Sequence, residues 1–191
     1  VKQPRNLRSF GFADNEKKNI IFTAPFPSNF FDGEVENIQG YFDFLKSIDQ
    51  YIANKANIYL RLKSMQGIDR ILKYIDTKNV KLLAGKNYTT AELMSQSDLV
   101  IATAGSGILC ECSLLRVKVV CYDIFGFLKE DWMGYGRDLY IDNAKDLYRI
   151  IGKFVNDKPL DVDWDLLWDE MVYPNTGNTN HIIQNLLDEI V

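Results

Sequence analysis

Short apolar runs alternate along this chain with segments of helical periodicity, and no other feature limits the fold as strongly. Runs of this kind followed by apolar residues at every third or fourth position are the pattern of βαβ units. Six runs predict strands, at residues 19–25, 57–63, 80–85, 98–105, 117–123 and 138–141. The predicted fold class is α/β, with a doubly wound, mostly parallel six-stranded sheet of the Rossmann-like type and a C-terminal helical tail.

Helices are expected between the strands and after the last of them. Their patterns occupy residues 38–48, 68–75, 89–97, 105–117, 144–157, 164–171 and 181–190. The helix over 89–97 opens at a threonine with Glu92 nearby, and Asn143 or Asp142 caps the helix over 144–157. Lys158 and Pro159 end that helix, because proline cannot continue one.

A change of composition at Pro159 divides the chain into three parts. We expect a lead-in over residues 1–18, a Rossmann-like domain over 19–158 and a helical tail over 159–191. The tail carries an apolar stripe at helical spacing, made of Trp164, Leu167, Trp168 and Met171. Such a stripe is more often packing than a sugar-stacking platform, and it would pack on this domain or on a missing N-terminal domain. The start at Val1 and the basic lead-in favour an excised piece of a longer protein.

Composition excludes several classes of function. Apolar residues make up 47% and charged residues 25% of the chain, which excludes disorder and low-complexity architectures. The 22 Lys and Arg against 26 Asp and Glu give a net charge of −4, and no basic run is dense enough for a phosphate backbone, so no nucleic acid partner is expected. Three cysteines without C-x-x-C spacing and one histidine predict no metal site and no disulfide framework.

Location is predicted from the same features. The free thiols fit a reducing compartment, no apolar stretch is long enough to span a membrane, and the opening residues lack the apolar segment of a signal peptide. We expect a cytoplasmic protein, with peripheral association at the inner membrane face left open. No cofactor is expected.

The binding site is predicted where the strand order reverses. In the common order 3-2-1-4-5-6 this point lies between the strands at 19–25 and 98–105, and ligands bind at the carboxyl ends of such strands. These ends are Thr23-Ala24-Pro25 and Thr103-Ala104-Gly105. The two following loops therefore face each other in the predicted fold.

The sequence T-A-G-S-G at residues 103–107 is the sharpest signal. Its small residues allow an anionic group to approach backbone N–H groups at the start of the following helix, so a phosphate group is the expected ligand. A tight turn that needs glycine for steric reasons is the alternative. The segment matches neither G-x-G-x-x-G nor G-x-x-x-x-G-K-[ST]. The sequence therefore gives no motif that predicts binding of a nicotinamide dinucleotide or ATP hydrolysis.

Glu111 follows one to two turns into the same predicted helix, where a carboxylate can accept hydrogen bonds from two ribose hydroxyls. A lone glutamate on a helix usually faces solvent. This one lies in sequence among apolar residues, namely Leu109, Cys110, Cys112, Leu114 and Leu115. A carboxylate in such surroundings needs a partner.

The segment SDLVIATAGSGILCECSLLRVKVVCYD resembles the nucleotide-sugar-binding, C-terminal half of GT-B glycosyltransferases and of UDP-N-acetylglucosamine 2-epimerase-like proteins. The resemblance covers about residues 19–156. It implies that Gly105, Ser106 and Gly107 receive the diphosphate, directly after Thr103, and that Glu111 binds the ribose.

The same resemblance extends to two further positions. Members that use CDP-linked or UDP-linked donors often have His-Pro after the second strand, where this chain has Lys63-Ser64, so Lys63 or Arg61 would supply the cation. Strand alternation places Arg61 and Lys63 on one face. The loop before the fourth strand corresponds to the one that meets the nucleobase, where Asn87 would donate a hydrogen bond and Tyr88 a stacking face. A polar loop anchored by one aromatic residue is the alternative.

The resemblance implies the donor-binding half of a GT-B glycosyltransferase of polysaccharide or surface-carbohydrate biosynthesis. The expected partners are a UDP- or CDP-linked sugar and an acceptor saccharide or lipid-linked acceptor, which a missing domain or a partner chain brings. No residue is assigned as the catalytic base, and whether the chain alone is an enzyme stays open. The alternatives are a non-catalytic nucleotide-sugar-binding subunit that needs a partner chain, and a nucleotide-sugar 2-epimerase fragment.

Overall fold

The computed structural model describes residues 16–23, 44–45, 47–62, 78–84, 89–103, 107–123 and 133–172. Within them, six strands form one sheet in the order β3-β2-β1-β4-β5-β6, and all five strand pairs are parallel. The strands are β1 Lys18–Thr23, β2 Ala56–Leu62, β3 Val80–Ala84, β4 Leu99–Thr103, β5 Val119–Tyr122 and β6 Tyr140–Ile141. The predicted strand order and α/β fold class are confirmed.

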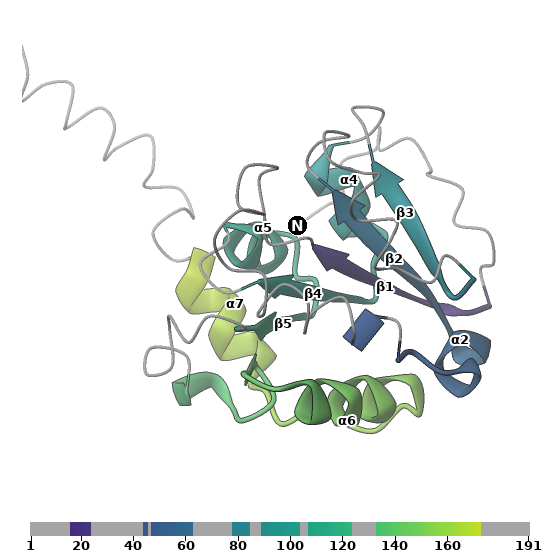
Figure 1. Ribbon diagram of the computed structural model, residues 1–191. Coiled ribbons are helices and arrows are strands. Elements are labelled where there is room, and N and C mark those ends of the chain that lie inside the picture. Colours follow the sequence, from purple (N-terminus) through teal and green to yellow (C-terminus); the bar gives the residue numbers. More distant parts are fainter. Residues whose placement is uncertain are drawn as a thin grey trace, which may run out of the picture.

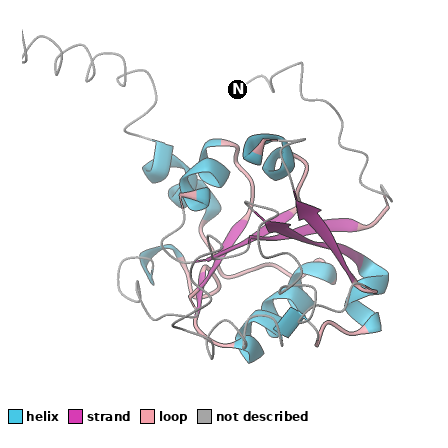
Figure 2. Ribbon diagram, turned by 45° about the horizontal axis from the view of Figure 1, so that its top comes forward, coloured by secondary structure: helices cyan, strands magenta, loops and turns pink. Residues whose placement is uncertain are grey.

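The strands are apolar almost throughout because helices cover both faces of the sheet. Figure 2 shows the strands between two layers of helices. In β1, Ile20 and Phe22 enter one buried cluster and Ile21 enters the other. Successive side chains of a strand point to opposite faces, so one short run supplies both clusters.

One helical layer consists of α2 Gln50–Lys55 and α6 Ala144–Val155, and the other of α4 Thr90–Ser95, α5 Ile108–Leu114 and α7 Trp164–Val172 (Figure 1). A 3-10 turn, η2 Met133–Tyr135, precedes β6. On the α6 side the buried cluster includes Ile52, Ile150 and Ile151, whose side chains pack over the strands. On the other side Leu93 of α4 and Leu167 of α7 are fully buried, so α7 packs on this domain, against α5. No helix among the described residues is long and apolar enough to cross a membrane.

Side-chain caps begin two of the helices that the sequence predicted, α4 and α6. In α4, Thr89 Oγ1 accepts from the Glu92 N–H at 3.2 Å while Glu92 Oε2 accepts from the Thr89 N–H at 2.7 Å, which is a capping box. In α6, Asn143 rather than Asp142 is the cap, and it accepts from the Asp146 N–H at 2.8 Å. These bonds satisfy backbone donors that a helix start otherwise leaves free.

Helix α2 was not predicted. It has six residues and buries only Ile52, so it shows no periodicity in sequence, although Asp49 Oδ1 caps it by accepting from the Ile52 N–H at 3.0 Å. The predicted helices over 68–75 and 181–190, and most of the one over 38–48, lie outside the described residues. The division of the chain at 18 and 158 stays a prediction.

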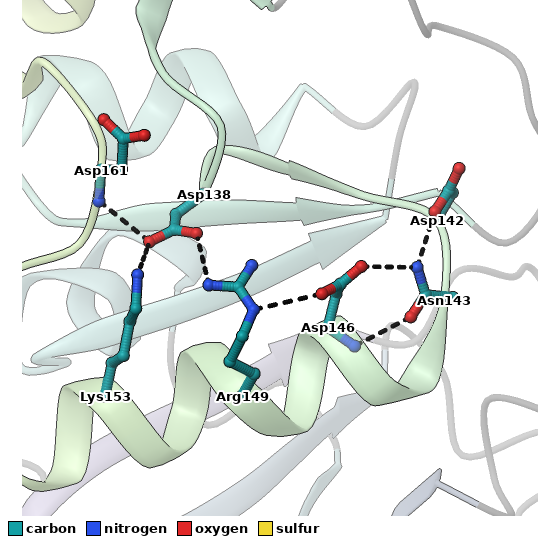
Figure 3. Close-up of polar contacts among 7 residues, drawn as sticks. All are labelled: Asp138, Asp142, Asn143, Asp146, Arg149, Lys153 and Asp161. Atoms are coloured by element: carbon teal, nitrogen blue, oxygen red, sulfur yellow. Dashed lines mark hydrogen bonds and ion pairs between the residues drawn. The ribbon is translucent and has the colours of Figure 1, made fainter.

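A buried carboxylate holds the tail to the sheet. Asp138, next to β6, has a side chain that is only 2% exposed. It accepts from Arg149 Nη1 at 2.9 Å, from Lys153 Nζ at 2.8 Å and from the backbone N–H of Asp161 at 2.9 Å (Figure 3). These three bonds join β6, α6 and the segment that leads into α7.

The backbone approaches itself closely at the same place. Gly136 has a φ of +126°, and a Cβ there would lie 2.2 Å from the carbonyl oxygen of Asp161. The Asp138 N–H donates to that same carbonyl at 3.1 Å. Glycine is required here by both its conformation and the lack of space.

Replacing Asp138 by Ala is expected to lower the free energy of unfolding by about 2 to 3 kcal/mol, because it leaves two cations and a half-buried N–H without their shared acceptor. Asp161→Asn is the matched control, since the Asp161 side chain is exposed and only its backbone takes part; it should change stability by less than about 0.5 kcal/mol. Urea denaturation measures both. Equal stability of the Asp138→Ala variant and the wild type would contradict this account.

Stability should also depend on pH through Asp138. Burial alone would raise the pKa of this carboxyl, but the bonds from Lys153, the Asp161 N–H and Arg149 outweigh burial and lower it. A folded pKa below the unfolded value of about 3.9 means that the contribution is fully present above that pH and is lost as the pH falls through the folded pKa. Urea denaturation between about pH 5 and pH 2 should show a shallower decline for Asp138→Asn than for the wild type. Parallel declines would show that Asp138 does not titrate in this way.

Candidate functional site

The strand order reverses between β1 and β4, and this switch point lies at the carboxyl edge of the sheet. Two threonines end these strands there: Thr23 is 2% exposed and Thr103 is 5% exposed. Thr23 Oγ1 on β1 donates a long hydrogen bond of 3.5 Å to the carbonyl oxygen of Ile101 on β4. The sequence prediction placed the binding loops after these same residues.

Arg61 lies beside the switch point. It is the neighbour of Thr23 in the parallel pairing of β2 with β1. Its half-buried side chain reaches α4, where Nη2 donates to Thr90 Oγ1 at 2.7 Å. Arg61 therefore holds a positive charge at the carboxyl edge, on the side of the sheet that α4 and α5 cover.

Helix α5 begins directly after the T-A-G-S-G segment, with Gly107 as its N-cap residue. Gly107 has a φ of −60°, which any residue adopts, and a Cβ built on it would meet no described atom within 4 Å. Neither backbone conformation nor packing in the described part of the chain requires glycine here. The steric alternative finds no support at Gly107.

Glu111 lies on the exposed side of α5, together with Cys110 and Leu114, whereas Leu109 and Cys112 face the core. The interpretation that its apolar sequence neighbours surround the carboxylate is therefore wrong, because helical geometry turns those neighbours to different sides. The carboxylate is open to solvent one turn after Gly107. Its part in binding ribose stays a prediction.

The other predicted site residues lie outside the described residues. These are Gly105, Ser106, Lys63, Asn87 and Tyr88. Among the predicted set, the structure places Thr103, Gly107, Glu111 and Arg61 at or near the carboxyl edge. The roles of all of them remain predictions.

Asp123 is a candidate that the sequence analysis missed. It follows β5, is 1% exposed, and donates its backbone N–H to the carbonyl oxygen of Ile141 at 2.7 Å. The residue before it, Tyr122, pairs with Thr103, so Asp123 lies at the same edge, one strand from the switch point. The signal in the sequence was an aspartate directly after an apolar strand, because a buried carboxyl group needs hydrogen-bond partners.

The two buried thiols, Cys112 and Cys121, have no evident nucleophilic role. Burial, with Asp123 contributing, raises the pKa of Cys121 to about 12, and burial raises the pKa of Cys112 as well. A thiol that stays protonated at neutral pH is a poor nucleophile. No group of three or more His, Cys, Asp or Glu side chains in the described ranges is arranged to hold a metal ion.

Comparisons by sequence and by structure differ in what they find. No protein-family model matches the chain, and no curated protein matches it either. By structure, it matches the UDP-N-acetylglucosamine 2-epimerase of Neisseria meningitidis, solved with UDP-N-acetylglucosamine bound, with a TM-score of 0.60 and 18% identity over 95% of this chain and 47% of the other. A Listeria monocytogenes protein described as a UDP-N-acetylglucosamine 2-epimerase matches with a TM-score of 0.53 and 15% identity, over 82% of this chain and 39% of the other.

These matches concern the fold. The chain spans less than half the length of either protein. The wall teichoic acid polymerase TagF is a weaker match, with a TM-score of 0.48 and 14% identity over 96% of this chain and 45% of the other. The predicted resemblance is confirmed at the level of architecture, and the chain has the fold of one Rossmann-like half of a GT-B protein.

Proposed function

We propose that the chain is the donor-binding half of a GT-B glycosyltransferase and holds a nucleoside-diphosphate sugar at the switch point. One observation carries the proposal: the T-A-G-S-G segment leaves β4 at the place where the order of the parallel strands reverses. Ligands of doubly wound sheets bind at this place. The fold match to an epimerase solved with UDP-N-acetylglucosamine supports the same class of ligand.

Each part of the donor has a proposed contact. Backbone N–H groups of residues 105–107 take the diphosphate, and the exposed carboxylate of Glu111 takes the ribose hydroxyls. Arg61, with Lys63, supplies positive charge beside the phosphates. Asn87 and Tyr88 meet the base of a UDP- or CDP-linked sugar.

The chemistry that these groups support is departure of the diphosphate. As the bond to the sugar breaks, negative charge grows on the leaving oxygen, and fixed positive groups lower the barrier by stabilising that charge. The acceptor, a saccharide or a lipid-linked acceptor, and the base that activates it come from another domain or a partner chain. The products belong to polysaccharide or surface-carbohydrate biosynthesis.

A nucleotide-sugar 2-epimerase is the second candidate, because the two structural matches with TM-scores of 0.60 and 0.53 carry that description. An epimerase removes the proton at carbon 2 of the sugar and returns one to the other face. Incubating the chain with UDP-N-acetylglucosamine in deuterated water separates the two candidates. We expect no deuterium at carbon 2 by NMR; exchange at that carbon would favour the epimerase over the transferase.

The binding prediction is tested by calorimetric titration with UDP, CDP, GDP and ADP. UDP or CDP should bind in the micromolar to millimolar range. Glu111→Gln should weaken that binding more than tenfold, because a hydrogen bond to a charged group contributes about 1.5 to 3 kcal/mol. Asp165→Asn, another exposed carboxylate but on α7, is the control and should bind as the wild type does. Failure of all four nucleotides to bind a folded sample would remove the site.

The charge prediction compares uridine with UDP. Arg61→Met should weaken the binding of UDP far more than the binding of uridine, because only UDP carries the diphosphate that the Arg61 charge attracts. Arg61 also bonds Thr90, so circular dichroism on heating must show that α4 and the domain remain folded. Equal weakening of both ligands would indicate a folding defect and not a phosphate contact.

A further inference from the structure

A groove of about 820 Å³ lies at the amino-terminal edge of the sheet, opposite the switch point. Lys18 at the start of β1, Asp98 before β4 and Lys118 before β5 form its floor. The ends of α4, α5 and α6 and the start of α7 complete its walls. Its volume is that of a small-molecule site, and no part of the proposed function uses it.

The groove carries positive charge on a chain that is negative overall. Four cationic side chains line it against the two carboxylates of Asp98 and Asp157, while the whole chain has a net charge of −4. Both carboxylates are occupied: Asp157 Oδ1 lies 2.5 Å from Lys18 Nζ, and Asp98 Oδ2 accepts from the Asn19 N–H at 2.7 Å. The cations are Lys18, Arg116, Lys118 and Lys158.

Two of these cations remain available for a ligand. Neither Lys118 nor Lys158 forms an ion pair within the described ranges. Lys118 Nζ lies 6.0 Å from the centre of the Phe154 ring, which Lys18 Nζ also approaches, at 4.9 Å. One end of the groove therefore concentrates ammonium groups around an aromatic ring, and an anion there would relieve their mutual repulsion.

Indole rings line the other end. The rings of Trp164 and Trp168 stack with their centres 6.0 Å apart and an angle of 30° between their planes. Both residues are half-buried, and the Arg116 guanidinium lies 5.9 Å from the Trp168 ring. Ser95 and Ser97 also line the groove; their hydroxyls donate to the carbonyls of Glu92 and Leu93 at 3.0 and 2.7 Å and keep lone pairs that can accept hydrogen bonds. An indole face packs well against the C–H face of a sugar ring, and hydroxyls bond the ring's edge.

Two residues of the groove keep side chains where glycine would be favoured. Arg116 has a φ of 54° and Asp157 a φ of 58°, and both follow the C-cap residue of a helix. Left-handed backbone costs a residue with a Cβ about 1 kcal/mol. Both end their helices in a Schellman motif, in which the Val117 N–H donates to the Cys112 carbonyl and the Lys158 N–H to the Lys153 carbonyl, each at 2.9 Å. Helix termination therefore explains these two conformations, and they place the Arg116 and Asp157 side chains at the groove.

We propose that this groove is a second ligand site, which binds a phosphorylated saccharide with its phosphate beside Lys118 and Lys158 and its sugar ring against the Trp164–Trp168 pair. The excess positive charge attracts a phosphate group. The indole faces can pack against a sugar ring, and the serine hydroxyls can hydrogen-bond it. The site lies at the opposite edge of the sheet from the proposed donor, so it anchors a ligand and does not take part in transfer.

The test uses glucose 6-phosphate as the probe, with glucose and inorganic phosphate as separate arms, titrated into the 191-residue chain and followed by ¹H–¹⁵N NMR. Glucose 6-phosphate should bind at least tenfold more tightly than either glucose or inorganic phosphate alone. Amide shifts should gather at residues 95–98, 115–118 and 157–168, away from 103–111. No binding up to about 10 mM, equal affinity for inorganic phosphate, or shifts at 103–111 would overturn the proposal.

Variants separate the two ends of the site. The double variant Lys118→Met and Lys158→Met should weaken glucose 6-phosphate at least tenfold, and Trp164→Leu should weaken it without changing the affinity for inorganic phosphate. Lys145→Met is the control, since Lys145 is an exposed lysine at the other end of α6 and does not line the groove. Loss of binding in the control, or none in the lysine pair, would contradict the assignment.

The two sites are also distinguished directly. Saturating UDP should leave the affinity for glucose 6-phosphate unchanged, because the sites lie at opposite edges of the sheet. Competition between the two ligands would place the sugar phosphate at the switch point and overturn the second site. Failure of UDP to bind, with glucose 6-phosphate still bound in the groove, would reject the proposed function and leave this inference standing.

Discussion

The parallel pairing of β1 with both β2 and β4 is the constraint on which the rest of the structure depends. Because β1 is central, its side chains must be apolar on both faces, and Ile20, Ile21 and Phe22 are all fully buried. The same pairing brings Thr23 beside Arg61 and next to β4, so residues far apart in sequence meet at one edge. A parallel sheet also sends all its amino ends to the opposite edge, where Lys18, Asp98 and Lys118 gather. Both candidate sites thus follow from one arrangement of strands.

The predictions from sequence were reliable where a local pattern decides the structure. A strand buried on both faces is a continuous apolar run, so β1, β4 and β5 were found within a few residues of their bounds. Helix α2 was missed because its single buried residue gives no period. Glu111 was misjudged because sequence neighbours on a helix face different directions. The groove was not foreseen at all, since its walls come from separate strands and helices and only tertiary structure brings them together.

The hydrogen bonds of Asp138 explain why residues 159–172, which include α7, pack on this domain. A chain leaving α6 at its C-terminal end must turn back to reach α5, and the turn is fixed by bonds from Asp161 to Asp138 and by the close backbone approach at Gly136. Leu167 then reaches the core beside α5. The stripe predicted for the tail is therefore divided: Leu167 packs, while the half-buried indoles form the wall of the groove. Packing and ligand contact are two uses of one helix.

The two edges of such a sheet must bind anions by different means. At the carboxyl edge α4 and α5 begin, so free backbone N–H groups point there and an anion needs few side chains. At the amino edge α5 and α6 end, so their last carbonyls lie at this edge; one of them, the Phe154 oxygen, accepts from Lys18 Nζ at 2.6 Å. Carbonyl oxygens repel an anion, so any anion held at this edge depends on side-chain cations that exceed the carboxylates. The groove meets this requirement, because lysine and arginine outnumber aspartate among its lining residues although the whole chain is acidic.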